Sequence, residues 1–125
     1  MTRTTTTAAE RATLGAYGEA LAARHLVAQG MVLLDRNWRC DIGEIDLVLR
    51  DAGVLVVCEV KTRSSIAFGS GIEAVTPTKA ARLRRLAARW LREHPVRPAE
   101  VRIDAVGVLV PRDGPIEVDH VRGVA

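Results

Sequence analysis

The sequence predicts an α/β domain whose elements follow the order helix, three strands, helix, two strands. Two helical segments, at residues 8–29 and 76–94, alternate with short runs that are rich in Val, Leu and Ile. The chain has 125 residues, of which 48% are hydrophobic, and this is enough for one domain with a sizeable core. We therefore expect a single domain over residues 8–125, preceded by a disordered tail at residues 1–7.

The first helix is expected at residues 8–29, because Gly30 is a residue that typically follows a helix directly. Gly18 lies within it, where glycine costs about 1 kcal/mol relative to alanine. We therefore expect Gly18 to allow the close approach of another element. Residues 31–38 then predict the first strand. The apolar face of the helix is expected to comprise Leu14, Tyr17, Leu21 and Ala28.

An apolar hairpin is expected next, with strands at residues 43–50 and 54–61. Both segments are dominated by Val, Leu and Ile, and the residues between them, Asp-Ala-Gly, are typical of a turn. Strand side chains alternate between the two faces of a sheet, so one face of the hairpin can be assigned to the core. That face is expected to carry Ile45, Leu47, Leu49, Val54, Val56, Cys58 and Val60.

Charged side chains interrupt the ends of this apolar hairpin, namely Asp46, Glu59 and Lys61. Buried charge is unfavourable unless it is paired or binds a metal. A turn centred between Ala52 and Gly53 would place Asp46 directly opposite Glu59, with Cβ atoms about 5 Å apart. A three-residue turn would instead put Glu59 on the other face. The sequence thus predicts an acidic pair, conditional on the turn.

A polar loop at residues 62–76 leads to the second helix, which begins with Pro77, since proline is favoured in a first turn. This helix is expected to end before Pro95. Its apolar side would comprise Ala80, Leu83, Leu86, Ala87 and Trp90. Residues 101–110 predict the fourth strand, and residues 115–121 predict a short strand at the edge of the sheet.

Positive charge is concentrated in the second helix. Seven basic residues and one acid between Lys79 and Arg97 give +6 in a chain whose net charge is +3. A localised basic surface suits a polyanion such as nucleic acid. The alternative is a solvated face in an arginine-rich sequence. Aromatic residues make up only 3% of the chain, which argues against a platform for base stacking.

Cysteine usage and hydropathy indicate the compartment. Cys40 and Cys58 cannot form a disulfide framework, and no residue spacing matches a zinc site. The first seven residues lack the apolar segment of a secretory signal. No apolar run reaches the ~20 residues that span a bilayer. We expect a cytoplasmic protein without a membrane partner.

The acidic pair and the lysine together suggest cleavage of a phosphodiester. Mg²⁺ takes oxygen ligands, typically one or two carboxylates with water and substrate phosphate. Asp46 and Glu59 would supply the carboxylates, and the Val60 carbonyl could add a ligand. Lys61 would orient the attacking water or stabilise charge on the phosphate. Mg²⁺ or Mn²⁺ is therefore the expected cofactor.

A series of short motifs resembles the bacterial YraN family, small proteins related in fold to archaeal Holliday junction resolvases. Within it, Asp46…Glu59-Val60-Lys61 resembles the PD-(D/E)XK nuclease motif. The series runs over residues 15–120 and comprises Gly18-Glu19, Arg36-Asn37, Gly43-Glu44-Ile45-Asp46-Leu47, Glu59-Val60-Lys61-Thr62-Arg63, Phe68-Gly69 and Lys79-x-x-Arg82. The resemblance implies a restriction-endonuclease-like αβββαβ core, with a mixed central sheet flanked by helices.

The resemblance also implies roles for individual residues. Glu19 on the first helix would be an acid that joins the metal site; the alternative is an ordinary exposed helix residue. Lys79 and Arg82 would contact phosphate. Arg85, on the same helix side as Arg82, would add a contact, and Arg63 is a candidate phosphate clamp. Resolvase-type nucleases act as dimers, and the last strand could pair with a second copy.

Three functions remain open on the sequence. The first is a Mg²⁺-dependent nuclease that acts on DNA rather than RNA, branched or structured DNA included. The second is a non-catalytic nucleic-acid-binding module of the same fold. The third is a protein-interaction adaptor whose charged cluster is structural. Glu44 could bind the metal or form a salt bridge with Lys61, and Asp104 is expected to pair with an arginine.

Overall fold

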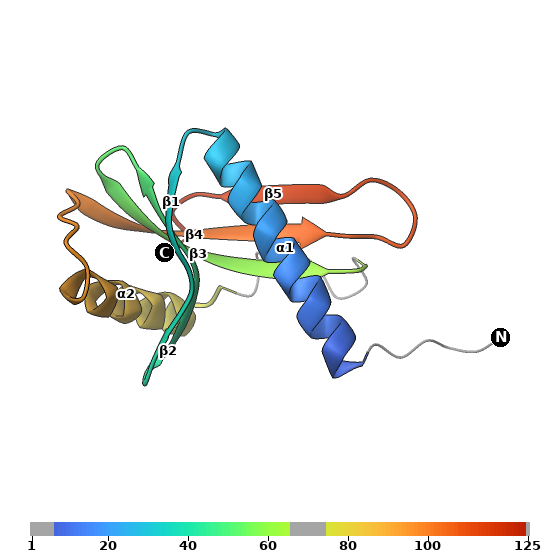
Figure 1. The fold of residues 1–125 in the computed structure, drawn as a ribbon, viewed down its shortest axis with the longest axis horizontal. Coiled ribbons are helices and arrows are strands. Elements are labelled where there is room, and N and C mark those ends of the chain that lie inside the picture. Colours follow the sequence, from blue (N-terminus) through green and yellow to red (C-terminus); the bar gives the residue numbers. More distant parts are fainter. Residues whose placement is uncertain (1–6, 66–74, 125) are drawn as a thin grey trace.

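A computed structural model describes residues 7–65 and 75–124 and shows a five-stranded sheet with one helix on each side (Figure 1). Residues 1–6 of the predicted tail, and residues 66–74 of the predicted loop, lie outside the described residues. Thr7 does not belong to the tail, because its side chain accepts a hydrogen bond from the Glu10 N–H and caps the first helix. The elements are α1 (Ala8–Ala28), β1 (Val32–Cys40), β2 (Gly43–Asp51), β3 (Val54–Arg63), α2 (Pro77–Arg92), β4 (Glu100–Leu109) and β5 (Glu117–Val121).

The sheet is mixed, and its strands follow the order β1-β2-β3-β4-β5. β3 and β4 are parallel, and all other neighbouring pairs are antiparallel. A parallel pair requires a crossover connection, which α2 supplies. The predicted αβββαβ order is therefore confirmed, and β5 is the expected edge strand. Neither of the two described helices is long and apolar enough to cross a membrane.

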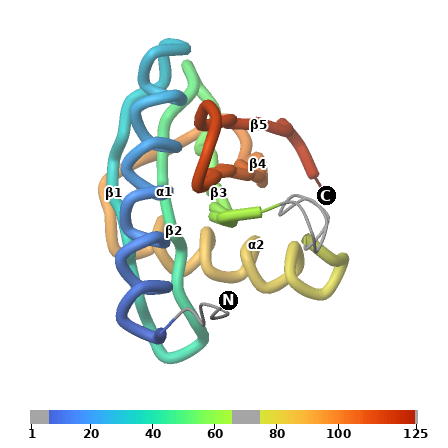
Figure 2. Tube along the Cα trace, turned by 90° about the vertical axis from the view of Figure 1, so that its right-hand side faces the viewer, coloured from blue at the N-terminus to red at the C-terminus, as the bar shows by residue number. Residues whose placement is uncertain are grey.

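Both faces of the sheet are buried, each under one helix (Figure 2). The expected core face lies under α1, with Leu47, Val56 and Cys58 among its fully buried side chains. The second face lies under α2 and contains Val48, Leu55 and Val57. The sheet therefore forms the middle layer of three, and polar groups on either face are enclosed unless they lie at its ends.

α1 packs through three small residues and one large one, Leu26, and leaves Tyr17 exposed. Its buried residues are Gly18, Ala22, Ala23 and Leu26. The predicted apolar face is wrong for Tyr17, which is 47% exposed, and for the exposed Ala28, whereas Leu21 packs against the core as predicted. A Cβ atom on Gly18 would collide with the Thr62 side chain of β3, at 2.6 Å from Cγ2 and 2.7 Å from Cβ. Glycine is thus required where α1 crosses the strand, as the sequence predicted.

α2 packs through the residues that its sequence pattern indicates. All five predicted side chains are buried: Ala80, Leu83, Leu86, Ala87 and Trp90. The Trp90 indole Nε1 also donates a hydrogen bond of 2.9 Å to the Asp35 carboxylate of β1. Thr76 caps the first turn of α2 by accepting from the Lys79 N–H. The helix is therefore fixed at both ends.

The β2–β3 hairpin has the predicted register, because its turn is centred between Ala52 and Gly53. Backbone pairing runs from Asp51↔Val54 to Leu47↔Cys58 and ends there. Beyond this point Ile45 packs with the α2 cluster and not on the α1 face, which corrects its predicted position. The physical reason is that β2, once unpaired from β3, follows the twist of its hairpin with β1 toward α2.

Candidate active site

The site lies where β2 separates from β3. One residue beyond the last pair, the Asp46 carboxylate accepts a hydrogen bond of 2.8 Å from the Val60 N–H. A side chain thus takes the place of the backbone carbonyl that a continued ladder would provide. Asp46 is held in a fixed orientation in the gap, with only 8% of its surface exposed.

The gap opens into a cavity of about 170 Å³ between the hairpin and the start of α2. Acidic side chains come from the strands, and basic side chains come from the helix. The lining residues are Gly43, Glu44, Asp46, Glu59, Lys79, Arg82, Leu83 and Leu86. Asp46 and Glu59, predicted to share a face, therefore line one cavity.

Burial governs the charge of Asp46. It raises the pKa of this carboxyl to about 7, although the hydrogen bond from the Val60 N–H acts in the opposite direction. The negative charges of Glu59, Glu19 and Glu44 raise it further. Full ionisation of Asp46 near neutral pH would therefore be favoured by a cation in the cavity.

Glu19 approaches the same cluster from α1. It is half-buried, and its side chain is hydrogen-bonded to Asn37 of β1. Burial raises the pKa of Glu19, the hydrogen bond to Asn37 lowers it, and the charges of Glu44 and Glu59 raise it again. Glu19 therefore lies close enough to Glu44, Asp46 and Glu59 for their charges to affect one another.

Two acids of the cluster have basic partners. The Lys79 Nζ lies 3.1 Å from Glu59 Oε1 and joins α2 to β3. Glu44 pairs with Arg39 across the β1–β2 hairpin at 2.8 Å. Glu44 therefore does not form the salt bridge with Lys61 that was the alternative expected from the sequence. At Glu44, β2 is paired with β1 and not with β3.

The oxygen atoms of the cavity suit a hard divalent cation. Asp46 and Glu59 present carboxylates, and hard cations such as Mg²⁺ use one or two of these. In an extended strand the N–H and C=O of one residue point to the same neighbour. Because the Val60 N–H donates to Asp46, the Val60 carbonyl also points to the β2 side of β3, beyond the end of the β2–β3 pairing. Within residues 7–65 and 75–124, no three His, Cys, Asp or Glu side chains are close enough to hold a metal by themselves.

Of the remaining predicted residues, Arg82 lines the cavity, whereas Lys61, Arg63 and Arg85 do not. Lys61 is exposed and, by alternation, lies on the same face of β3 as Glu59. Arg63 continues that face and is partly buried, with its Nε lacking a hydrogen-bond partner among the described residues. Arg82 lines the cavity, whereas Arg85 is exposed on α2 outside it.

Comparison with known proteins identifies the family of this chain. The profile described as "Uncharacterised protein family UPF0102" matches residues 18–108. The chain belongs to the UPF0102 family. It is 66% identical over 117 residues to a UPF0102 protein of Nocardioides sp. strain JS614, covering 94% of each chain.

Two further UPF0102 relatives are similar over most of their length. A protein of Frankia alni is 62% identical over 110 residues, 88% of this chain and 92% of its own. A protein of Streptomyces coelicolor is 59% identical over 117 residues, 92% of this chain and 90% of its own. This UPF0102 membership agrees with the resemblance to the YraN family. The region matched by the family profile includes Glu19, Asp46, Glu59 and Lys61, and ends within β4.

Asn37 is a site residue of this UPF0102 chain to which sequence reasoning gave no role. Its φ is 52°, a left-handed conformation that Asn tolerates better than most residues. Its side chain bonds to Glu19 across the gap between β1 and α1. The Arg36-Asn37 pair was visible as a motif, but its contact depends on how α1 packs against β1.

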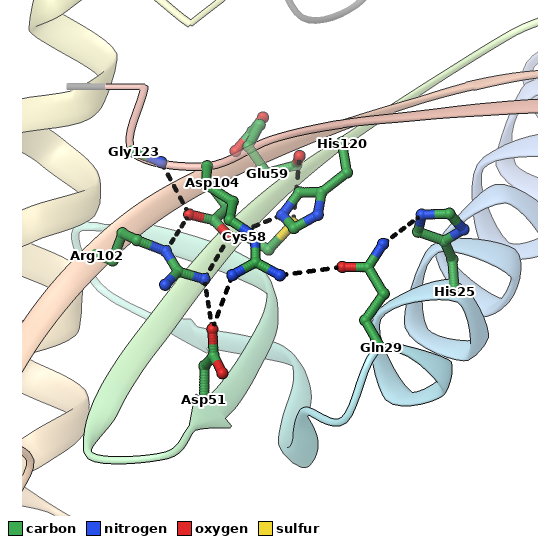
Figure 3. A network of polar contacts seen from close by, with 10 residues as sticks. His25, Gln29, Asp51, Cys58, Glu59, Arg102, Asp104, His120 and Gly123 are labelled. Carbon is green, nitrogen blue, oxygen red and sulfur yellow. Dashed lines mark hydrogen bonds and ion pairs between the residues drawn. The ribbon is translucent and has the colours of Figure 1, made fainter.

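A second carboxylate, Asp104, is fully buried on the α1 side of the sheet (Figure 3). It accepts hydrogen bonds of 2.8 and 3.0 Å from Arg102, 2.8 Å from His120 and 3.1 Å from the Gly123 N–H. Burial alone would raise the pKa of Asp104, but these bonds outweigh it and hold the pKa below its usual value. The predicted pairing with an arginine is confirmed, and Asp104 is a structural group.

Proposed function

We propose that this protein is a divalent-metal-dependent nuclease that hydrolyses phosphodiester bonds in DNA, branched or structured DNA included. The observation that carries this proposal is that the buried Asp46 and the partly buried Glu59 line one cavity with Lys79 and Arg82. Carboxylates beside basic side chains suit a bound cation and a phosphate together. The resemblance of Asp46…Glu59-Val60-Lys61 to the PD-(D/E)XK motif supports the same chemistry.

Each residue has a defined role in this proposal. Asp46, Glu59 and the Val60 carbonyl would hold Mg²⁺ or Mn²⁺, which, when bound, polarises the phosphate and activates a water molecule. Lys61 would stabilise the negative charge that develops on the phosphate oxygens. Glu19, oriented by Asn37, would be the auxiliary acid.

The basic side chains would bind the nucleic-acid backbone. Lys79, Arg82 and Arg85 lie along α2, and Arg63 extends the face of β3 beyond Lys61. Contacts of this kind neutralise phosphates and release counterions. We expect affinity for DNA that falls steeply with salt and varies little with base sequence.

A cleavage panel tests the nuclease. The wild-type protein and Lys61→Ala would be incubated with Mg²⁺ or Mn²⁺ and with single-stranded, duplex, flap and four-way DNA, and with RNA. We expect the wild type to cleave at least one DNA and the variant to be about 10²-fold slower, as for loss of one transition-state charge contact. Equal residual cleavage by both proteins would mean contamination and would defeat the proposal. Binding of DNA without cleavage would favour a non-catalytic module.

Calorimetry tests the metal site separately. Titration of the wild type with Mn²⁺ or Mg²⁺ should release or absorb heat, and Glu59→Ala should abolish it, because half of the carboxylate pair is removed. Asp113→Ala, in an exposed turn, is the matched control and should bind as the wild type does. A heat that Glu59→Ala leaves intact, or no heat at all, would remove the metal site.

A further inference from the structure

We propose that Lys79 serves as the counter-ion of Glu59 before a divalent cation binds, and that the cation displaces it toward the substrate phosphate. This inference rests on the proposed metal site. It assigns to one side chain two successive partners, first a carboxylate of the site and then the phosphate of the nucleic acid.

The position of Lys79 makes this exchange physically direct. The Lys79 N–H donates a hydrogen bond to the side chain of Thr76, the N-cap of α2. The backbone of Lys79 is therefore fixed in the first turn of the helix. Its ammonium lies 3.1 Å from Glu59 Oε1, at the wall of the cavity that also contains Asp46. The ammonium thus occupies space beside the oxygen that a cation would need.

Electrostatics oppose the presence of both positive charges at once. A divalent ion held by Asp46 and Glu59 would repel an ammonium in contact with the same carboxylate. The Lys79 side chain is 34% exposed, so solvent is within its reach, and four methylene groups allow its charge to move away. An arginine with a planar, bidentate grip on Glu59 would be harder to displace.

The exchange also couples metal binding to nucleic-acid binding. A phosphate bound to the cation would lie in the same cavity as the released ammonium, because Asp46, Glu59 and Lys79 all line it. The free energy of such coupling is reciprocal between the two ligands. Metal should therefore strengthen the contribution of Lys79 to DNA affinity.

Metal affinity provides the first test. Lys79→Met removes the competing charge, so we expect calorimetry to show about tenfold tighter binding of Mn²⁺ than in the wild type, within the usual range for coupled sites. Lys79→Gln should show the same direction and guards against a variant that fails to fold, which circular dichroism would detect. Arg92→Met is the matched control, since Arg92 is exposed about 20 Å farther along the same helix. Its Mn²⁺ affinity should stay within about twofold of the wild type.

Direct observation of the side chain provides the second test. The chain contains only two lysines, Lys61 and Lys79, so ¹³C labelling of lysine gives two Cε signals in NMR spectra. We expect Mg²⁺ to shift the Lys79 signal in the wild type and not in Glu59→Gln. A Lys79 signal that does not move while calorimetry shows Mg²⁺ binding would overturn the exchange and leave the proposed nuclease intact. Absence of Mg²⁺ and Mn²⁺ binding in the wild type and in Lys79→Met would defeat both.

Discussion

At the scale of single residues, Asp46 is a buried carboxylate that accepts a hydrogen bond from a backbone N–H, that of Val60. Burial and neighbouring acids raise its pKa to about 7, from a usual value of 3.8. The folded state therefore binds more protons than the unfolded state between these two values. The contribution of Asp46 to stability is full below pH 4 and is lost as pH rises through about 7.

We accordingly predict that Asp46→Asn stabilises the protein in alkaline solution. Asparagine keeps an oxygen for the Val60 N–H but carries no charge. The free energy of unfolding, measured with urea, should exceed that of the wild type by about 2 kcal/mol at pH 8 and by little at pH 5. Asp113→Asn, in an exposed turn, should change it by less than about 0.5 kcal/mol at both pH values. A loss of stability in Asp46→Asn at pH 8 would contradict this account of the buried charge.

The same residue illustrates what sequence can predict about a site. Asp46 and Glu59 belong to one hairpin, so side-chain alternation and the turn length fix their relation, and the observed register agrees. Lys79 reaches Glu59 from a helix 20 positions later, across residues 66–74 that separate the two elements in sequence. No periodicity relates these two residues, so their ion pair could be found only in the folded chain.

At the scale of elements, the two helices differ in how well the sequence predicts which of their residues are buried. α2 buries large apolar side chains and exposes arginines, so its 3.6-residue pattern predicts every buried position. α1 buries Gly18, two alanines and Leu26, and leaves Tyr17 exposed. Hydrophobicity alone favours the larger residues, whereas the close crossing over β3 selects small ones.

This close crossing gives a prediction for α1. Gly18→Ala should destabilise the protein by about 1–3 kcal/mol, because the new methyl group collides with Thr62, whose Cγ2 and Cβ would lie 2.6 and 2.7 Å away. Gly15→Ala is the matched control in the same helix, since nothing lies within 4 Å of its added Cβ. Its helix propensity should instead raise the unfolding free energy by up to about 1 kcal/mol.

Urea unfolding of the two glycine variants at pH 7 measures both effects. Opposite signs are expected for changes that are chemically identical and differ only in position. Equal effects would mean that the contact between α1 and β3 can relax to accept a methyl group. Because Glu19 follows Gly18 directly, a displaced α1 should also weaken Mn²⁺ binding in Gly18→Ala, measured by calorimetry, and leave it unchanged in Gly15→Ala.

At the scale of the whole molecule, the sheet separates two buried carboxylates of opposite character. Asp46 lies in the cavity under α2 among other acids. Asp104 lies on the α1 side and joins β4, β5 and the C-terminal segment through Arg102, His120 and Gly123. Arg102 also reaches Asp51 at the β2–β3 turn at 3.1 Å, so this network connects most of the sheet (Figure 3).

The opposite environments of these carboxylates predict opposite responses to the same substitution. Asp104→Asn would remove the buried negative charge that pairs with Arg102. It would also place the NH₂ group of an amide among hydrogen-bond donors, namely Arg102, His120 and the Gly123 N–H. We expect a loss of about 3 kcal/mol in unfolding free energy at pH 8, where Asp46→Asn should gain stability.

The pKa of Asp104 is lowered in the folded protein, so its contribution to stability is present above about pH 3.8 and is lost as pH falls below that value. The difference in unfolding free energy between the wild type and Asp104→Asn should therefore narrow in acid. The difference between the wild type and Asp46→Asn should widen as pH rises to about 7 and then stay constant. Urea titrations of the three proteins between pH 3 and pH 9 measure both trends, and parallel curves for the two variants would show that the faces of the sheet do not differ in this way.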